Sequence, residues 1–336
     1  MITYQYSKEL DFGTSANVPS FTIFPIRVRK DDSLSQKASK KFVTRRKKAG
    51  LQFASPTSAC QCPFGHIVSL VIPECPPDKV ALATKLFEYT FIENDLLETF
   101  GSEEEKELEH AKSRLNRTDS DIRDEIIEEM LDIDNPIMSL MIVSYQKYLE
   151  AKQARGSGPS TFQEYIQWRV EHVGACILTT AVWIFMDIHA DAKEMESIQH
   201  LIRPLEESFG LCNDYFSYDK ERDDLMEGRG ANAVAFLMQT ERITEEKALE
   251  RIKQNIISLE TAHHAAFEAS MKEGALSPEL QRFILFLQSA MGGFHIYQAT
   301  AGRYQTSADA KAHPDSISMR LVMNSVFYLN WLYLLK

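Results

Sequence analysis

Apolar residues recur at helical spacing along most of this chain, and this pattern is the strongest constraint on its fold. Long segments repeat apolar side chains every three or four residues, and no run alternates polar and apolar residues as a half-buried strand does. Only 14 glycines and 12 prolines interrupt the 336 residues, of which 44% are hydrophobic. The sequence therefore predicts an all-α protein, a single helical bundle of about ten helices without strands.

The helix boundaries follow from the periodicity and from start signals. Thr161 and Glu164 form a capping-box pattern that opens a helix at Phe162. Pro204 falls inside another predicted helix, where proline can cause a kink. Residues 1–36 look irregular, and 103–123 read as an exposed helix or loop. We expect helices over 37–49, 78–100, 124–132, 135–155, 162–188, 194–218, 244–272, 278–299 and 325–336.

Charge and cysteine content argue against several classes of protein. The 37 Lys and Arg residues against 48 Asp and Glu residues give a net charge of -11, whereas broad nucleic-acid binding needs a basic surface. Five cysteines without a zinc-type CxxC pair argue against a disulfide framework or a structural metal. The start lacks a signal pattern, and the longest apolar run, 174–186, is too short to span a bilayer. We expect a cytoplasmic protein without membrane insertion.

The most specific polar pattern is formed by Asn213, Ser217 and Glu221, which are spaced four and four. On a helix such residues share one face. An amide oxygen, a hydroxyl and a carboxylate suit Mg²⁺, which is commonly shared with a substrate phosphate, and Lys220 could add a positive charge for that phosphate. The alternative is a polar helix end that runs into the charged segment 219–224.

A second polar cluster continues an apolar stripe. Phe87 and Phe91 are followed at helical spacing by Asn94 and Glu98, with Asp95 between them. If this helix faces the Asn213 helix across a cavity, the two clusters could hold a diphosphate through several Mg²⁺ ions. An ordinary acidic helix end is the alternative.

Other residues could bind phosphate or shape a pocket. Arg169 carries a guanidinium fork suited to bidentate phosphate recognition, although a surface ion pair would also explain it. Gly174 lets another backbone approach closely or serves packing alone. Arg303 and Tyr304 place a phosphate donor and a phenol near a helix end. Aromatic residues that could wall an apolar pocket, or simply fill a core, are Phe87, Phe91, Trp183, Phe185, Phe294, Tyr297 and Trp331.

Together these pieces, in this order on an all-helical chain, resemble a class I terpene synthase. More closely, the chain resembles the cyclase domain of fungal chimeric terpene synthases, in which a cyclase precedes a prenyltransferase domain. The likeness covers nearly the whole chain and is most specific over 213–221, NDYFSYDKE. The other matching segments are YQYS near the start, FPIRVRK, VIPECPPDKVALATKLFEYTFIENDLLE, TFQEYIQWRVEHVG and GRY.

The resemblance implies one cyclase domain over 1–336, an α-helical bundle around a central apolar cavity, with no prenyltransferase domain in this chain. It also implies three Mg²⁺ ions and a diphosphate-sensing pair, Arg303 and Tyr304, with Arg169 and Lys220 contacting diphosphate. By position, the metal ligands would be Asn94, Asp95, Glu98, Asn213, Ser217 and Glu221.

Two positions depart from the family pattern. Asn94 stands where the family has its first aspartate, and an uncharged ligand should hold Mg²⁺ less tightly. His172, three residues after Arg169, stands where the family usually has an aspartate, which links the diphosphate-binding arginine at the position of Arg169 to the backbone near Val173 and Gly174. A histidine in this place could make the link with a pH-dependent charge.

The implied activity is ionisation of a linear prenyl diphosphate, cyclisation of the carbocation and release of diphosphate. The resemblance favours geranylgeranyl diphosphate, then geranylfarnesyl diphosphate, then farnesyl diphosphate. One alternative is a chain-lengthening prenyl diphosphate synthase, which normally carries two aspartate-rich motifs. Another is a catalytically silent helical module that binds a prenyl diphosphate or a protein partner. A homo-oligomer is a further open alternative. The chain is either a stand-alone enzyme or a truncated cyclase domain of a chimera, and its prenyltransferase domain is separate or missing.

Overall fold

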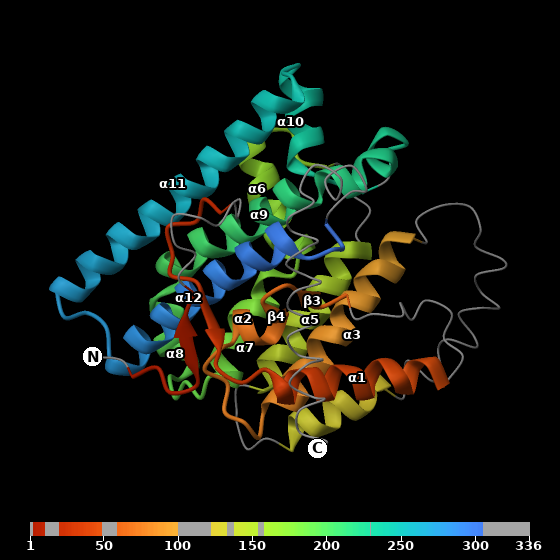
Figure 1. Ribbon diagram of the computed structural model, residues 1–336. Helices are drawn as coiled ribbons and strands as arrows, with labels where there is room; N and C mark the ends of the chain where they lie inside the picture. The colour runs from red at the N-terminus through yellow and green to blue at the C-terminus, as the bar shows by residue number, and fades with distance from the viewer. Residues whose placement is uncertain are drawn as a thin grey trace.

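Helices account for nearly all regular structure in the computed structural model, which describes residues 3–10, 20–48, 59–99, 122–132, 138–153, 158–228 and 230–304 (Figure 1). The prediction of an all-α protein is confirmed. The helices are α1 (Ser33–Lys48), α2 (Ile67–Val71), α3 (Val80–Thr99), α5 (Met138–Gln153), α6 (Phe162–His172), α7 (Ala175–Phe185), α8 (Ala192–Ser197), α9 (Gln199–Met226), α10 (Ala233–Glu241), α11 (Glu245–Lys272) and α12 (Pro278–Thr300), with a further helical segment over 122–131.

The expectation that the chain has no strands is wrong. Strand β1 (Ser7–Glu9) pairs antiparallel with β2 (Arg27–Arg29), and β3 (Gln61–Cys62) pairs antiparallel with β4 (Gly65–His66). Each strand has only two or three residues. Such short strands cannot show the two-residue alternation on which the prediction relied.

The helix predicted over 162–188 is two helices with a break between them. The capping box is present: Thr161 Oγ1 accepts a hydrogen bond from the Glu164 N–H at 3.2 Å, and the Glu164 carboxylate accepts one from the Thr161 N–H at 3.1 Å. Gly174 separates α6 from α7 and has a φ of 71°, which glycine adopts easily. The apolar pattern continues across this break, so periodicity alone did not reveal it.

The other predicted helices are found with shifted ends. Helix α1 begins at Ser33, and the helix predicted over 194–218 is divided into α8 and α9. Helix α9 continues through Pro204 and ends at Met226. Helices α2 and α10 were not predicted. The helix expected over 325–336 and most of the segment 103–123 lie outside the described residues.

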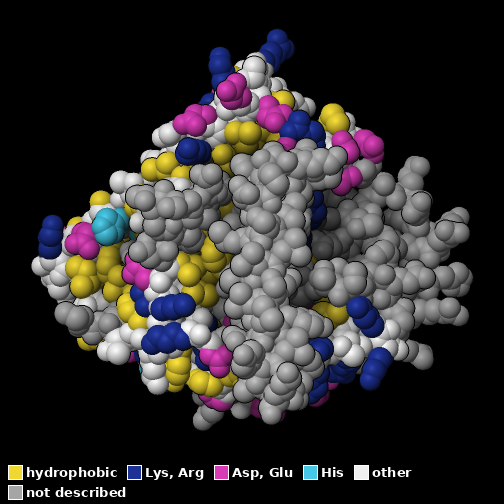
Figure 2. All heavy atoms as spheres, viewed as in Figure 1, with side chains coloured by type: hydrophobic (Ala, Val, Ile, Leu, Met, Phe, Trp, Pro, Cys, Tyr) yellow, Lys and Arg dark blue, Asp and Glu magenta, His cyan; other side chains and the backbone are white. Residues whose placement is uncertain are grey.

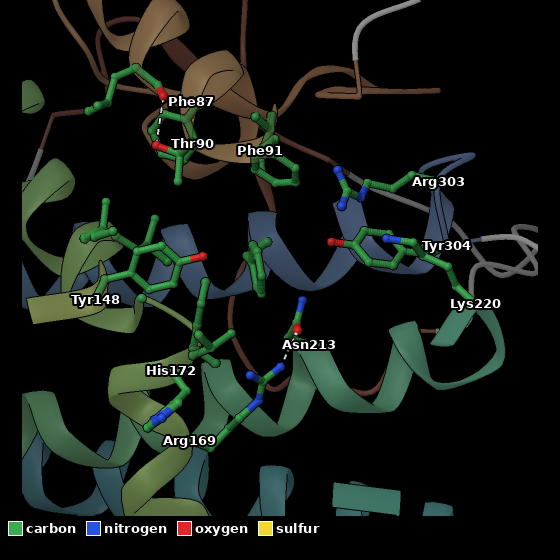
Figure 3. Close-up of a pocket in the computed structure, with 18 of the residues that line it drawn as sticks. Phe87, Thr90, Phe91, Tyr148, Arg169, His172, Asn213, Lys220, Arg303 and Tyr304 are labelled. Carbon is green, nitrogen blue, oxygen red and sulfur yellow. Dashed lines mark hydrogen bonds between the residues drawn. The ribbon is translucent and has the colours of Figure 1, made fainter. Parts of the chain in front are cut away.

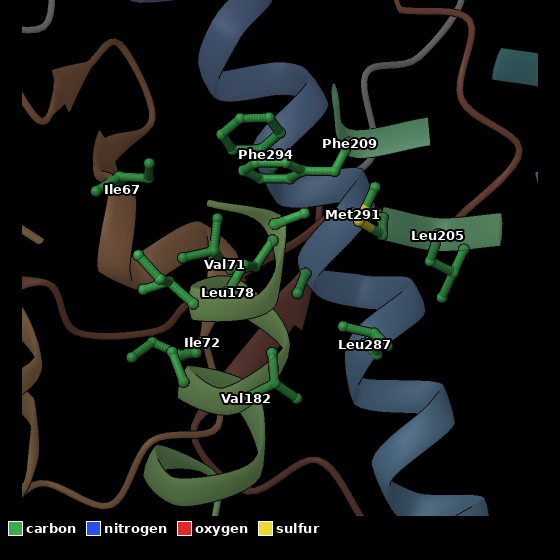
Figure 4. Close-up of a cluster of buried hydrophobic side chains, with 14 of the residues drawn as sticks. Ile67, Val71, Ile72, Leu178, Val182, Leu205, Phe209, Leu287, Met291 and Phe294 are labelled. Carbon is green, nitrogen blue, oxygen red and sulfur yellow. The ribbon is translucent and has the colours of Figure 1, made fainter. Parts of the chain in front are cut away.

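Helices α9 and α12 run side by side through the centre of the bundle (Figures 1 and 4). The rings of Phe209 and Phe294 stack with centroids 3.9 Å apart, and Cys212 Sγ lies 3.5 Å from His295 Nδ1. From the first contact to the second, the residue number increases on both helices, so the two helices run parallel. A Cβ on Gly293 would lie 2.1 Å from the Leu70 carbonyl oxygen, so α12 also packs directly on the backbone of α2.

The surface mixes charges where the structure describes it. In the view of Figure 2, acidic and basic side chains intermingle at the top of the molecule, around α10. Among the described helices, none combines the length and the apolar character that crossing a membrane would require.

Candidate active site

A cavity lies among the central helices and has one charged end and one apolar end (Figure 3). The empty space in it amounts to about 900 Å³, a volume that includes open solvent at its mouth. Arg303, Tyr304 and Lys220 lie at one end in Figure 3, and Tyr148 lies at the other. The lining residues are Ile67, Leu86, Phe87, Thr90, Phe91, Tyr148, Arg169, His172, Val173, Gly174, Ile177, Leu178, Phe209, Asn213, Lys220, Glu221, Phe294, Arg303 and Tyr304.

The structure brings most of the site residues expected from the sequence to this one cavity. Those that line it are Phe87, Phe91, Arg169, Gly174, Asn213, Lys220, Glu221, Arg303 and Tyr304. Ser217 is buried one turn beyond Asn213 on α9. Asn94, Asp95 and Glu98 belong to the last turns of α3, beyond Phe91, and their side chains lie outside the described part of the structure.

Trp183 does not line the cavity. Its indole N–H donates a hydrogen bond to the Ala190 carbonyl oxygen at 3.2 Å, and its side chain is buried in the core. Helix α7 turns Ile177 and Leu178 toward the cavity, and Trp183 follows them on another face of that helix. Of the other aromatic candidates, Phe294 lines the cavity, whereas Phe185 and Tyr297 are core residues and Trp331 lies outside the described residues.

Two oxygen-bearing side chains of α9, those of Ser217 and Glu221, share a hydrogen-bond partner in Asn232. Asn232 Nδ2 donates to Glu221 Oε2 at 3.1 Å and lies 3.4 Å from Ser217 Oγ, so these two oxygens meet around one point. Asn232 Oδ1 also caps α10 by accepting the Val234 N–H at 2.9 Å. With Asn213 one turn earlier, the donor set consists only of oxygens and fits a hard cation such as Mg²⁺.

Arg169 is held by Asp214, a fully buried carboxylate. Its Nε donates to Asp214 Oδ1 at 2.8 Å, and its Nη2 lies 2.7 Å from the same oxygen. The Tyr165 hydroxyl and the Ala233 N–H donate to Oδ2 at 2.7 and 2.9 Å. Four donor groups therefore satisfy this buried charge and join α6, α9 and α10.

The contacts with Asp214 determine the protonation states of Arg169 and Tyr165. Burial lowers the pKa of Arg169, but the negative charge and hydrogen bond of Asp214, together with Tyr165 and Glu221, raise it, so the pKa lies above its usual value and the guanidinium stays charged. Burial, together with Asp214, raises the pKa of Tyr165 well above its usual value. Tyr165 therefore stays a hydrogen-bond donor.

Arg169 also contacts the candidate metal ligand Asn213 on α9. Its Nη2 donates a hydrogen bond to Asn213 Oδ1 at 3.0 Å (Figure 3). A candidate phosphate-binding group and a candidate metal ligand thus contact each other directly.

Arg303 lies against aromatic rings at the charged end of the cavity. Its guanidinium carbon is 4.8 Å from the Phe91 ring centroid and 5.3 Å from that of Tyr304. The Tyr304 ring packs edge-on against Tyr297, with centroids 6.1 Å apart. This packing positions the phenol and the guanidinium together.

His172 lines the cavity and is held by Trp168. Its Nδ1 donates to the Trp168 carbonyl oxygen at 2.9 Å, and the two rings stack with centroids 3.6 Å apart. Val173 N–H donates to the Arg169 carbonyl oxygen at 2.9 Å, which continues the helix toward Gly174. The proposed role of His172 as a link from Arg169 to this backbone stays a prediction.

A second group of potential metal ligands is better explained as a hydrogen-bonded cluster. Ligand atoms of Cys60, His66 and Glu88 lie within 4.8 Å of one another in the core. His66 Nδ1 accepts the Val68 N–H at 3.2 Å, so Nε2 carries the proton and donates to Glu88 Oε1 at 3.2 Å. A protonated nitrogen cannot bind a metal, and the Ser39 hydroxyl also donates to Glu88.

Sequence reasoning missed four residues of this site. Asp214, Tyr165 and Asn232 hold the candidate ligands, and the Tyr148 ring closes the apolar end. The one available signal was Asp214, because an acidic residue next to Asn213 on a core helix needs a buried partner. Asn232 lies in a loop eleven residues after Glu221, where helical spacing gives no guidance.

The fold matches that of solved class I terpene synthases. Aristolochene synthase from Penicillium roqueforti superposes with a TM-score of 0.65 at 16% identity, covering 83% of this chain and 98% of that chain. A 2-methylisoborneol synthase from Streptomyces coelicolor, solved in complex with Mg²⁺ and geranyl-S-thiolodiphosphate, superposes with a TM-score of 0.62 at 18% identity, covering 83% and 95%.

Residues 94–261, half of the chain, match the family described as terpene synthase family 2, C-terminal metal binding, and the chain belongs to this family. Quiannulatene synthase of Emericella variicolor is 25% identical over 272 residues, which are 73% of this chain and 36% of that protein. Sesterterpene synthase btcA of Colletotrichum orbiculare is 23% identical over 94% of this chain and 48% of that protein. The chain thus spans about a third to a half of the length of these relatives.

Proposed function

We propose that this chain is a terpene cyclase domain that ionises a linear prenyl diphosphate, cyclises the resulting carbocation and releases diphosphate. One observation carries the proposal: one cavity is lined by Asn213 and Glu221 of α9, by the three cationic side chains of Arg169, Lys220 and Arg303, and by apolar and aromatic side chains. Membership in the terpene synthase family supports it.

The charged end would bind the diphosphate together with metal ions. Three Mg²⁺ ions are proposed, and when bound they neutralise the charge that develops on the leaving diphosphate. Asn213, Ser217 and Glu221 would hold one of them. The remaining ions are assigned to the residues of α3 that follow Phe91, namely Asn94, Asp95 and Glu98.

The chain's own cations would orient the leaving group. Arg169 and Arg303 offer planar guanidinium forks for diphosphate oxygens, and Lys220 offers a point charge. The Tyr304 hydroxyl would donate a hydrogen bond to the same diphosphate. Because these donors are partly withdrawn from water, each interaction is stronger than at the surface.

The apolar and aromatic part of the cavity wall would fold the substrate and protect the carbocation. Phe87, Phe91, Phe209 and Phe294 present aromatic rings, whose faces attract positive charge, and their bulk keeps water out. Gly174 lets the Tyr148 ring lie close to the α6–α7 break, since a Cβ there would come within 3.2 Å of that ring.

We propose geranylgeranyl diphosphate as the substrate, as the resemblance to chimeric cyclases favours. Geranylfarnesyl diphosphate is the second candidate, because the name of one relative is that of a sesterterpene synthase. Farnesyl diphosphate is the third. A prenyltransferase, either a separate protein or a further domain, would supply the substrate. A homo-oligomer and a cytoplasmic location also stay predictions.

The decisive experiment incubates the purified chain and Mg²⁺ with each of the three diphosphates in turn, followed by gas chromatography and mass spectrometry of a hexane extract. A cyclic hydrocarbon or alcohol from one substrate is the expected result, with the Asn213→Ala variant and a chelator as controls. Longer prenyl diphosphates formed after addition of isopentenyl diphosphate would instead identify a chain-lengthening synthase. Binding of prenyl diphosphate without any product would identify a silent module.

A further inference from the structure

Helix α1 carries charge of one sign, unlike the mixed surface around α10. Its 16 residues include seven of the 37 Lys and Arg residues of the chain and no Asp or Glu, although the whole chain has a net charge of -11. In Figure 2, basic side chains gather at the lower right, where α1 ends in Figure 1. Six of the seven side chains are exposed and form what we call the basic face: Lys37, Lys40, Lys41, Arg45, Lys47 and Lys48.

The basic face lies opposite the side by which α1 packs on the protein. At about 100° per residue, the six cations fall within an arc of roughly 160°. The Ser39 hydroxyl donates a hydrogen bond to Glu88 Oε1 at 2.5 Å, so the buried side of α1 rests on α3. The buried residues, which centre on the far side of the helix, are Ser35, Ser39, Phe42 and Arg46.

Carboxylates neutralise little of the basic face. Arg45 pairs with Glu125 of the helical segment 122–131 at 2.5 Å, and an exposed pair of this kind is weak. Lys37, Lys40 and Lys41 make no ion pair with any residue that the structure describes. The positive charge of these three lysines is therefore available to a negatively charged partner.

The composition of the basic face indicates the kind of partner. Five of its six cations are Lys, a compact point charge that attracts negative charge without fixed geometry, whereas Arg forks suit defined carboxylates. Of the large apolar residues of α1, only Leu34 is exposed, at 38%. Protein interfaces are anchored by aromatic and apolar side chains, which this face lacks. A diffuse layer of negative charge, such as anionic lipid headgroups present, fits it better than a protein does.

We propose that the basic face of α1 docks on the anionic headgroups of a phospholipid membrane and holds the protein at its surface. Helix α3, on which α1 packs, supplies Phe87 and Phe91 to the cavity wall. The membrane therefore lies one helix away from the cavity. Under the proposed function the product is apolar, so a nearby lipid phase can take it up; in this respect alone the inference rests on that function.

Vesicle flotation with the intact chain, without prenyl substrate, tests the docking. Vesicles of phosphatidylcholine alone are compared with vesicles that also contain phosphatidylserine. The wild type should bind only the vesicles with phosphatidylserine, because only these carry net negative charge. Binding should weaken as the salt concentration rises, since salt screens charges at the surface.

Charge reversal shows whether α1 carries this binding. The variant Lys37→Glu, Lys40→Glu, Lys41→Glu should bind phosphatidylserine vesicles at least about 100-fold more weakly, as expected for three basic residues near an anionic surface. Glutamate is as good a helix former as lysine, and circular dichroism checks the fold. A matched control makes the same change in net charge and should retain most of the affinity, with glutamate in place of three exposed lysines of α8 and α11: Lys193, Lys247 and Lys272.

Several results would overturn the docking. They are equal binding to both kinds of vesicle, no binding at low salt, or an equal loss in the two triple variants. Retention on immobilised polyglutamate without vesicle binding would identify an acidic protein as the partner instead. Product formation in the substrate assay without vesicle binding would refute the docking and leave the proposed function intact, whereas vesicle binding without product would support the docking and count against that function.

Discussion

At the scale of single residues, two side chains of the site, Arg169 and Asn232, each contact two others. Arg169 contacts both Asp214 and Asn213, and Asn232 contacts both Glu221 and Ser217. Each shared contact fixes the direction of a ligand side chain before any ligand is bound. The role of a residue here therefore depends on its neighbour as much as on its own chemistry.

Asn213→Ala should abolish turnover while the protein remains folded. The change removes one candidate metal ligand from a helix position that alanine favours. The loss of activity should reach at least the roughly 10–100-fold that loss of even an outer-shell partner costs. Steady-state kinetics with circular dichroism measures it, and activity close to that of the wild type would remove Asn213 from the metal site.

Asn232→Ala should weaken metal binding and stability together. The variant loses the amide that orients Glu221 and Ser217, at a cost of roughly 10–100-fold in metal affinity or activity. It also loses the cap of α10, worth about 1 kcal/mol. Metal titration and urea denaturation measure the two effects. Asn232→Ser can retain the cap, so it should recover stability without recovering metal affinity; recovery of both would refute the orienting role.

At the scale of elements, the cavity depends on where helices end. The break between α6 and α7 bends the chain at the cavity wall, and Gly174 occupies it with a φ of 71°. The N-terminus of α10 reaches back to α9 through Asp214, which accepts the Ala233 N–H at 2.9 Å. Helix ends, more than helix middles, thus bring side chains from different elements together.

Gly174→Ala should destabilise the protein by more than about 1 kcal/mol, because alanine disfavours this backbone conformation and its Cβ would press on Tyr148 and Ile177 at 3.2 Å. Gly158→Ala is the matched control, since no atom lies within 4 Å of a Cβ there and its φ is not positive. Urea denaturation compares the two variants. Equal stabilities would show that the break does not require glycine.

The sequence was informative where spacing reports directly on structure. The four-residue intervals from Asn213 to Glu221 predicted a shared helix face, and the Thr161 capping box predicted a helix start that the structure confirms. It was uninformative where residues meet only through the fold. Trp183 looks from its sequence like a suitable wall residue, but the rotation of α7 places it in the core. No local pattern links Asn232 to Glu221.

At the scale of the whole molecule, the buried carboxylate of Glu260 connects the N-terminal segment at Thr22 and Ile23 to α9 and α11. Glu260 on α11 accepts hydrogen bonds from the Thr22 hydroxyl and the Ile23 N–H, both at 2.9 Å, and from the Ser208 hydroxyl on α9 at 3.2 Å. Burial raises the pKa of Glu260 to about 7, even though these donors lower it.

Glu260 should therefore make stability depend on pH. Because its pKa is raised on folding, the folded protein binds a proton more tightly than the unfolded chain between about pH 4.5 and pH 7. Its contribution to stability is fully present below that range and is lost as the pH rises through about 7. Between pH 5 and 8 the loss should be roughly 1–3 kcal/mol.

The comparison with Glu260→Gln isolates this effect. Burial lowers the pKa of His263 to about 4 and that of His295 to about 3. These two histidines therefore lower the stability as the pH falls, which is opposite to the effect of Glu260. Urea denaturation of both proteins from pH 5 to 8 gives the difference in slope. Parallel stability curves for the two proteins would show that Glu260 does not titrate in this range.

The parallel pair α9 and α12 has a consequence for how such a cavity can change over time. The stacked rings of Phe209 and Phe294 line the cavity, four residues before Asn213 on α9 and nine residues before Arg303, which follows the end of α12. Under the proposed function, the residues that shape the space and those that bind the diphosphate occupy separate positions along α9, and along α12 and the residues that follow it. A substitution of Phe294 would then alter the shape of the product and leave the proposed diphosphate-binding residues unchanged.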